Sequence, residues 1–107
     1  MKTRNNAFRC GERELRVFRL VGKRWTLAIL ASLMQGPARF SELARAVPGL
    51  SERVMSERLQ ELCEARVVER VVEPGRPPAA TYRLTPIGEC LRPAVESLRQ
   101  AALTLPD

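Results

Sequence analysis

The sequence predicts one mainly α-helical domain that carries a small β-hairpin, an α+β fold. Three observations predict it. Helix-spaced apolar residues run through most of the chain, a valine-rich stretch is followed by a proline-rich turn and a short extended return, and the chain has 107 residues, the size of a single small domain. Hydrophobic residues make up 45% of the sequence, which supplies a packed core and is too high a share for a disordered chain.

The first third of the chain is expected to be helical. Residues 12–21 place apolar side chains at helical spacing with arginines between them, so they predict an amphipathic helix with Phe18 in the core. Residues 25–34 are apolar on nearly every side and predict the buried central helix, with Trp25 in the core. The Gln-Gly-Pro sequence of residues 35–37 ends this helix.

The middle of the chain predicts two helices joined by a tight turn. Ser41 is the expected cap of a short helix over residues 42–47, which Pro48-Gly49 ends. Ser51 begins the best-marked helix, over residues 51–65, which has an apolar stripe on one side and polar residues on the other. A short helix, a turn and a longer capped helix with a polar outer face form a helix-turn-helix pattern.

A β-hairpin is predicted directly after this pattern. Residues 67–73 are rich in valine and predict a strand, residues 74–78 (Pro-Gly-Arg-Pro-Pro) predict a turn, and residues 79–84 predict the return strand. A hairpin directly after a helix-turn-helix makes a winged helix-turn-helix. The wing then spans about residues 67–85 and carries Arg76 at its tip.

The last helix is expected to begin at Thr85-Pro86, a cap followed by proline at the first helical position. Its apolar residues recur at spacings of three and four up to about residue 102, and Pro93 should kink it or cost a hydrogen bond. Cys63 and Cys90 lie on or beside apolar stripes and are expected to be small buried side chains. So long a stripe in so small a domain favours dimerisation through the terminal helices; packing of the stripe on the chain's own domain is the alternative.

The net charge of +6 comes entirely from the first quarter of the chain. Residues 1–24 hold eight cations against two glutamates, whereas the basic and acidic residues of 25–107 cancel. The sequence therefore predicts a basic N-terminal arm over residues 1–11, attached to a winged-helix domain over residues 12–105. Such an arm can lie along a nucleic-acid phosphate backbone, or it is a solvated terminus.

The composition argues against an enzyme. The chain has no histidine and its only aspartate is Asp107, which excludes His-based catalysis, His metal ligands and Asp-rich calcium loops. Three widely spaced cysteines without a CxxC pair favour neither a disulfide scaffold nor a zinc site. No apolar stretch approaches the length of a membrane span. We expect a cytoplasmic protein without membrane contact, metal or cofactor, and the sequence leaves a small-molecule effector open.

A set of motifs in fixed order spans about residues 12–103. It consists of Val21-Gly22-Lys23-Arg24-Trp25-Thr26-Leu27, Ile29-Leu30, Gly36, Arg39-Phe40-Ser41-Glu42-Leu43, Pro48-Gly49-Leu50-Ser51, Arg58-Leu59, Leu62, Val68-Glu69-Arg70, Pro77-Pro78, Tyr82-Arg83-Leu84-Thr85 and Gly88. With these motifs the chain resembles the HxlR-type, MarR-like winged-helix transcription regulators of bacteria. The family usually has glycine at the end of its recognition helix, where this chain has Arg66.

The resemblance implies a homodimer that binds double-stranded operator DNA and regulates transcription. The helix over residues 51–65 would enter the major groove and the wing would touch the flanking DNA. The predicted DNA-contacting residues are Ser51, Arg53, Ser56, Glu57, Arg58 and Gln60 on that helix, Arg76 on the wing, and Arg24 and Arg39 nearby. For Arg24 a snorkelling surface position is the alternative, and Arg83 on a wing strand either contacts DNA or pairs with Glu69.

Two features keep other functions open. Residues 51–65 contain two arginines and four glutamates, an acidic balance that is unusual for a helix in a DNA groove and allows a winged helix that binds protein instead. Cys10 lies near Arg9 and Arg13, and basic neighbours favour a reactive thiolate. Because some members of the family sense oxidants or electrophiles through an N-terminal cysteine, the resemblance also implies a redox-sensing role for Cys10.

Overall fold

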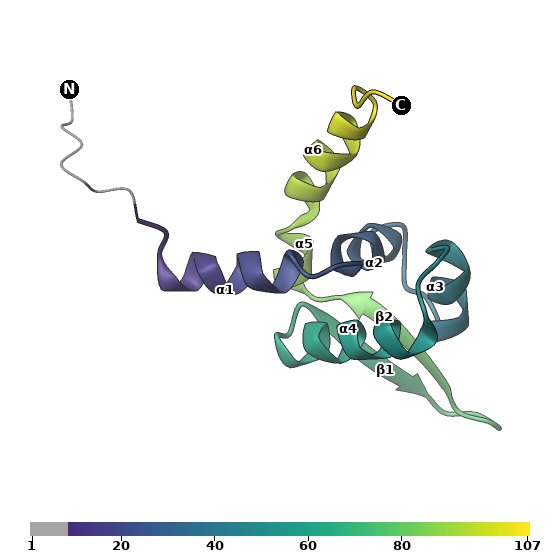
Figure 1. The fold of residues 1–107 in the computed structure, drawn as a ribbon. Helices are drawn as coiled ribbons and strands as arrows, with labels where there is room; N and C mark the ends of the chain where they lie inside the picture. The colour runs from purple at the N-terminus through teal and green to yellow at the C-terminus, as the bar shows by residue number, and fades with distance from the viewer. Residues whose placement is uncertain (1–8) are drawn as a thin grey trace, which may run out of the picture.

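The computed structural model describes residues 9–107, which form a winged helix-turn-helix with a helix added at each end (Figure 1). The elements are α1 (Glu12–Val21), α2 (Thr26–Leu33), α3 (Phe40–Ala46), α4 (Glu52–Glu64), β1 (Val68–Glu73), β2 (Ala79–Leu84), α5 (Pro86–Glu89) and α6 (Arg92–Ala102). The predicted α+β fold is confirmed. Most of the predicted basic arm, including Lys2 and Arg4, lies outside the described residues.

The core forms where α2, α3 and α4 meet the base of the hairpin. The side chains with almost no exposed surface are Thr26, Ile29, Leu30, Leu43, Met55, Leu59, Leu62 and Val68. The prediction that residues 25–34 form the central buried helix is confirmed, except that the helix begins at Thr26. Trp25 precedes it with a φ of 80° and packs, half-buried, against the core.

The first helix of the helix-turn-helix, α3, begins earlier than predicted. Its first residue is Phe40 rather than Glu42, so Ser41 lies inside the helix and is not its cap. The carboxylate of Glu42 accepts a hydrogen bond from the backbone N–H of Arg39 at 2.8 Å. This contact gives a partner to a backbone N–H that the start of a helix leaves without one. The sequence predicts that the Ser41 hydroxyl caps the helix in this way.

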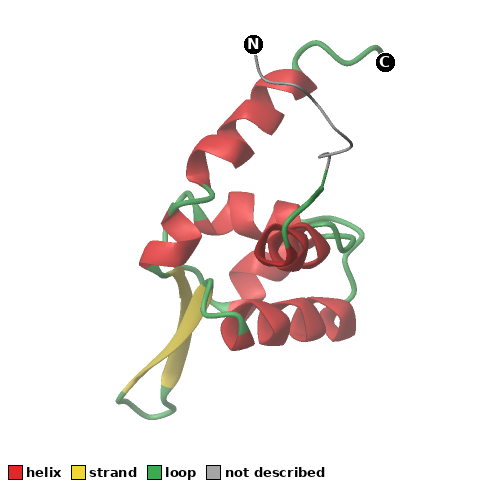
Figure 2. Cartoon of the chain, turned by 90° about the vertical axis from the view of Figure 1, so that its left-hand side faces the viewer, coloured by secondary structure: helices red, strands yellow, loops and turns green. Residues whose placement is uncertain are grey.

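The hairpin is fixed at its base. β1 and β2 pair antiparallel with Val68 opposite Leu84, and the predicted turn and return strand are confirmed. Ala38, between α2 and α3, adds a bridge to Tyr82: the N–H of Ala38 donates to the carbonyl of Tyr82 at 3.0 Å, and the reverse bond measures 2.8 Å. The far end of the hairpin extends beyond the helices (Figures 1 and 2), as a wing does.

The last helix is divided in two. The sequence predicts one helix from Pro86 to about residue 102, whereas the chain breaks at Cys90 and Leu91 between α5 and α6. The break places Pro93 in the first turn of α6, where its missing N–H leaves no helical hydrogen bond unmade. Cys90 is exposed at this break, so the expectation that it is buried is wrong.

Arg92 ties α6 to the domain. Its guanidinium donates to both carboxylate oxygens of Glu89, at 2.8 and 2.9 Å, and to the backbone carbonyl of Met34 at the end of α2, at 3.0 Å. Val95 is the one buried residue of α6. Together these contacts set the direction in which α6 leaves the domain.

The apolar sides of α1 and α6 are left largely uncovered. α1 has no buried residue, and Phe18 is 56% exposed, so its predicted place in the core is wrong for the single chain. Leu98 on α6 is 54% exposed. Both helices are amphipathic as predicted, and both project from the rest of the domain (Figure 1). None of the helices within residues 9–107 is long and apolar enough to cross a membrane.

Candidate nucleic-acid interface

The polar side of α4 faces outward. The helix begins as predicted, because the Ser51 Oγ accepts a hydrogen bond from the backbone N–H of Val54 at 3.1 Å. Its apolar side, with Met55, Leu59 and Leu62, is buried in the core. The other predicted contact residues Arg53, Ser56, Glu57 and Gln60 are all exposed on α4. The helix therefore offers a polar surface of the kind that a recognition helix needs.

Arg58 is placed differently from the other predicted contact residues of α4. Its Nε donates to the backbone carbonyl of Arg24 at 3.1 Å, and its Nη1 donates to both carboxylate oxygens of Glu61, at 3.1 and 3.2 Å. Only 18% of its side chain is exposed. The guanidinium is thus engaged within the protein and joins α4 to the α1–α2 turn, residues 22–25.

Glu61 also joins α4 to the α1–α2 turn, through its carboxylate. It lies 2.7 Å from the Nζ of Lys23 in the α1–α2 turn, as well as in contact with Arg58. The hydrogen bond from Lys23 and the charge of Arg58 lower the pKa of the Glu61 carboxyl, outweighing the opposite effect of desolvation. One of the four glutamates of residues 51–65 is therefore neutralised by cations of the protein itself.

Sequence reasoning missed Lys23 and Glu61. The pair of Arg58 and Glu61 has a visible signal, because residues three apart on a helix are neighbours. Lys23 and Glu61 are 38 residues apart in the sequence, and no periodicity connects a turn before one helix with the side of another. Only the fold, in which α2 and α4 contribute to one hydrophobic core, brings them together.

The wing carries one cation at its tip and one ion pair along its strands. Arg76 is exposed in the turn between β1 and β2, where the sequence predicts it. Arg83 on β2 lies 2.6 Å from the carboxylate of Glu69 on β1. Of the two alternatives for Arg83, the pair with Glu69 is the one present. Arg76 at the tip is therefore available for a phosphate, as is Arg70 on β1, which is exposed and forms no ion pair within residues 9–107.

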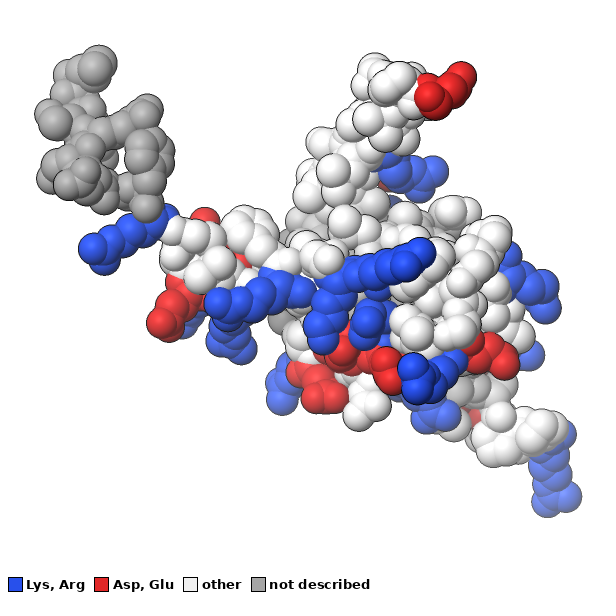
Figure 3. All heavy atoms as spheres, viewed as in Figure 1, with Lys and Arg blue, Asp and Glu red and all other residues white. Residues whose placement is uncertain are grey.

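Further cations surround α4. Arg24 is exposed in the α1–α2 turn, and Arg39 is exposed where α3 begins. Figure 3 shows basic side chains along α1, over the region where α1, α2 and α4 meet, and at the end of the hairpin, with acidic side chains between them. The positive charge is thus distributed around α4 rather than concentrated on it.

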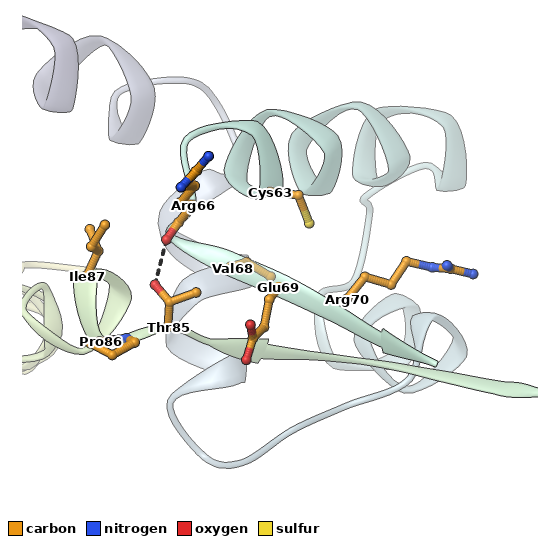
Figure 4. A pocket seen from close by; sticks show the side chains of 8 residues that line it. All are labelled: Cys63, Arg66, Val68, Glu69, Arg70, Thr85, Pro86 and Ile87. Carbon is orange, nitrogen blue, oxygen red and sulfur yellow. Dashed lines mark hydrogen bonds between the residues drawn. The ribbon is translucent and has the colours of Figure 1, made fainter. Parts of the chain in front are cut away.

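The three cysteines lie in different surroundings. Cys10 is exposed just before α1. Cys63 is half-buried on α4 and, with Val68 and Ile87, lines a mainly apolar pocket of about 570 Å³ between α4, β1 and α5 (Figure 4). Burial raises the pKa of the Cys63 thiol, which lowers the fraction of nucleophilic thiolate that this cysteine holds at neutral pH.

Comparisons with known proteins agree with this architecture. A family model described as HxlR-like helix-turn-helix matches residues 20–104. The chain is 39% identical over 82 residues to the HTH-type transcriptional regulator YodB of Bacillus subtilis (strain 168). This match covers 77% of this chain and 73% of YodB. It is also 37% identical over 102 residues to the uncharacterized HTH-type transcriptional regulator YtfH of Escherichia coli (strain K12). This match covers 94% of this chain and 79% of YtfH.

Solved structures show the same fold. The reduced form of YodB superimposes with a TM-score of 0.79 at 35% identity, covering 88% of this chain and 92% of YodB. The redox regulator HypR in its oxidized form gives a TM-score of 0.83 at 27% identity, covering 87% of this chain and 96% of HypR. YodB and YtfH are named as transcriptional regulators and HypR as a redox regulator; they are regulators and not enzymes. The chain belongs to the HxlR-like helix-turn-helix family of transcriptional regulators.

Proposed function

We propose that this regulator is a homodimer that binds a specific DNA sequence, with α4 in the major groove and the wing on the flanking DNA. The observation that carries the proposal is the capped helix α4 beside the hairpin, with Ser51, Arg53, Ser56, Glu57 and Gln60 exposed on its polar side. Arg53 and Gln60 suit guanine and adenine edges, and Glu57 can accept a hydrogen bond from cytosine. Ser51 and Ser56 suit phosphates.

The attraction to DNA comes mainly from cations outside α4. They are Arg24, Arg39 and Arg76, together with the basic arm over residues 1–11 that precedes the domain over residues 12–105. Each of these side chains can neutralise a phosphate and release counterions. Operator binding then combines base contacts made by α4 with phosphate contacts made by cations of the surrounding elements.

The terminal helices are the proposed dimer contact. The exposed apolar side chains of the described terminal helices and their ends are Val17, Phe18, Ile87, Leu98, Leu103 and Leu105. A second copy of the chain would cover such surfaces through a twofold interface. Two α4 helices related by that axis would read half-sites about one helical turn, roughly 34 Å, apart.

The experiment is selection of bound duplexes from a random-sequence pool, followed by titration of the selected duplex and of a scrambled duplex of the same composition. We expect preferential binding of the selected duplex by a dimer, two half-sites in it, and an affinity that falls with salt. Sedimentation of the free protein reports the dimer separately. Equal affinity for the two duplexes would rule out sequence-specific DNA binding and favour a winged helix that binds protein.

A second proposed function is thiol-based sensing through Cys10. Its exposed thiol before α1 favours it, as does similarity to YodB, which has been solved in diamide-treated form, and to the redox regulator HypR. Diamide should then lower the DNA affinity of the parent protein and leave that of Cys10→Ser unchanged. If both proteins respond alike, Cys10 is not the sensor; Cys90→Ser is the matched control, because that thiol is also exposed.

A further inference from the structure

The α1–α2 turn is held against the recognition helix by side chains of that helix. The backbone of Arg24 is fixed by Arg58, and the side chain of Lys23 is fixed by Glu61. Glu61 also holds Arg58, so the three charged groups form one connected network. The network joins two elements that are far apart in the sequence, and it involves residues at the edge of the polar face of α4.

The backbone of this turn is strained. Trp25 has a φ of 80°, in the left-handed region, which bulky residues rarely adopt because the Cβ approaches the backbone. Such a conformation persists only where the surrounding structure holds it, and it is found preferentially at functional sites. Here the holding contacts are the packing of Trp25 on the core and the network of Arg58, Glu61 and Lys23.

The turn presents two cations where the recognition helix itself is short of positive charge. Lys23 and Arg24 are both exposed. One hydrogen of the Lys23 ammonium goes to Glu61, which leaves others free to donate to a phosphate oxygen. The guanidinium of Arg24 lies 4.9 Å from the centre of the Trp25 ring, and this contact limits the directions it can take.

We propose that the α1–α2 turn is a phosphate-contact site for the DNA backbone, in which Lys23 and Arg24 bind a phosphate beside α4. Glu61 and Arg58 are positioning residues that hold the turn at the correct distance from the groove. This inference rests on the proposed DNA binding and adds to it Lys23, Glu61 and the role of Arg58. It also gives Glu61, an acidic residue on the recognition helix, a favourable role in binding a polyanion.

The role of Glu61 has a test in which simple electrostatics and positioning predict opposite results. Removing a negative charge near DNA should strengthen binding to any duplex. If Glu61 positions Lys23 and Arg58, its removal should weaken binding to the selected duplex. Glu64 is the matched control, because it is an exposed glutamate on the same helix and forms no ion pair within residues 9–107.

The experiment compares the parent with Glu61→Ala, Glu61→Gln and Glu64→Ala on the selected and scrambled duplexes. We expect Glu61→Ala to bind the selected duplex about five- to ten-fold more weakly than Glu64→Ala, a difference of the size seen when a phosphate contact is lost. The scrambled duplex should show a loss of similar size, because a phosphate contact carries no sequence information. Glu61→Gln keeps an acceptor oxygen and should recover part of the affinity, which a charge effect alone would not produce.

Lys23→Gln provides a second measurement that does not depend on Glu61. Lys23 is a half-exposed surface residue, so the variant should fold, and its salt slope should be about one unit shallower than that of the parent. Adding Glu61→Ala to Lys23→Gln should cost less affinity than Glu61→Ala alone, because both act through one pair.

The outcomes separate this inference from the proposed function. If the parent prefers its selected duplex but Glu61→Ala binds it as well as Glu64→Ala does, the positioning role is wrong and the proposed function stands. An unchanged salt slope in Lys23→Gln would likewise show that Lys23 does not contact a phosphate. If the parent shows no preference for any duplex, the proposed function fails, and this inference fails with it.

Discussion

Glu61 accepts hydrogen bonds from cations on two different elements, and its surroundings favour the ionised carboxylate. A carboxyl group with a lowered pKa in the folded state links stability to pH. The unfolded chain binds the proton at a higher pH than the folded chain does. The contribution of Glu61 to stability is therefore fully present above the ordinary glutamate pKa and is lost as the pH falls through the lower, folded-state value.

This gives a pH prediction at the scale of one residue. Between pH 6 and pH 3, the parent should lose more stability than Glu61→Gln, which has no carboxyl group to protonate at this position. The side chain is 29% exposed, so the difference should not exceed about 1 kcal/mol. Urea unfolding of both proteins at the two pH values measures it. Equal losses would mean that the ion pairs of Glu61 do not stabilise the fold.

Individual residues were predictable from sequence where the cause is local. The Ser51 cap follows from its place directly before an amphipathic helix, and its hydroxyl makes the expected bond. Phe18 and Cys90 were expected to be buried and are exposed. An amphipathic pattern identifies the apolar side of a helix but does not say what covers it, and the part of this chain that the structure describes covers neither residue.

At the scale of elements, Arg66 ends α4 in an unusual way. It lies between α4 and β1 with a φ of 60°, the left-handed conformation that commonly follows the end of a helix and favours glycine. The Thr85 hydroxyl donates to its carbonyl at 2.6 Å. The family pattern of glycine at this position therefore has a backbone reason, and this chain keeps the conformation without the residue that suits it.

Replacing Arg66 by glycine should stabilise the protein. The substitution removes the steric cost of a Cβ at positive φ, offset in part by the greater freedom of glycine in the unfolded chain, for a net gain of up to about 1 kcal/mol. Arg66→Ala is the control, because it removes the same side chain but keeps the Cβ. Thermal unfolding should place Arg66→Gly above Arg66→Ala; the reverse order would show that the backbone is not strained.

The elements themselves follow from sequence more closely than their junctions do. The return strand and its turn were predicted at the residues where they occur, because prolines and glycine interrupt the valine-rich run there. The sequence predicts a kink at Pro93, whereas the structure breaks the helix at Cys90 and Leu91, before the proline. The apolar spacing continues across this break, and only the requirement that Pro93 fall in a first helical turn divides the helix.

At the scale of the whole molecule, the basic arm is a separable part of the proposed DNA-binding surface. Removing residues 1–9 takes away Lys2, Arg4 and Arg9. If the arm lies along the phosphate backbone, the truncated protein should bind the selected duplex more weakly, with a salt slope about two to three units shallower. Titrations at several salt concentrations measure the slope. An unchanged slope would identify the arm as a solvated terminus.

The single tryptophan of the chain occupies a junction of the molecule. Trp25 lies in the strained α1–α2 turn, next to the guanidinium of Arg24, and its ring also reaches Gly49, in the turn of the helix-turn-helix, where an added Cβ would lie 3.5 Å from the ring. Its indole emission therefore reports on a single position, between the α1–α2 turn that is proposed to bind the phosphate and the helix-turn-helix that is proposed to contact the bases. The unlabelled protein carries its own optical probe, and a fluorescence titration can follow that junction directly as DNA is added.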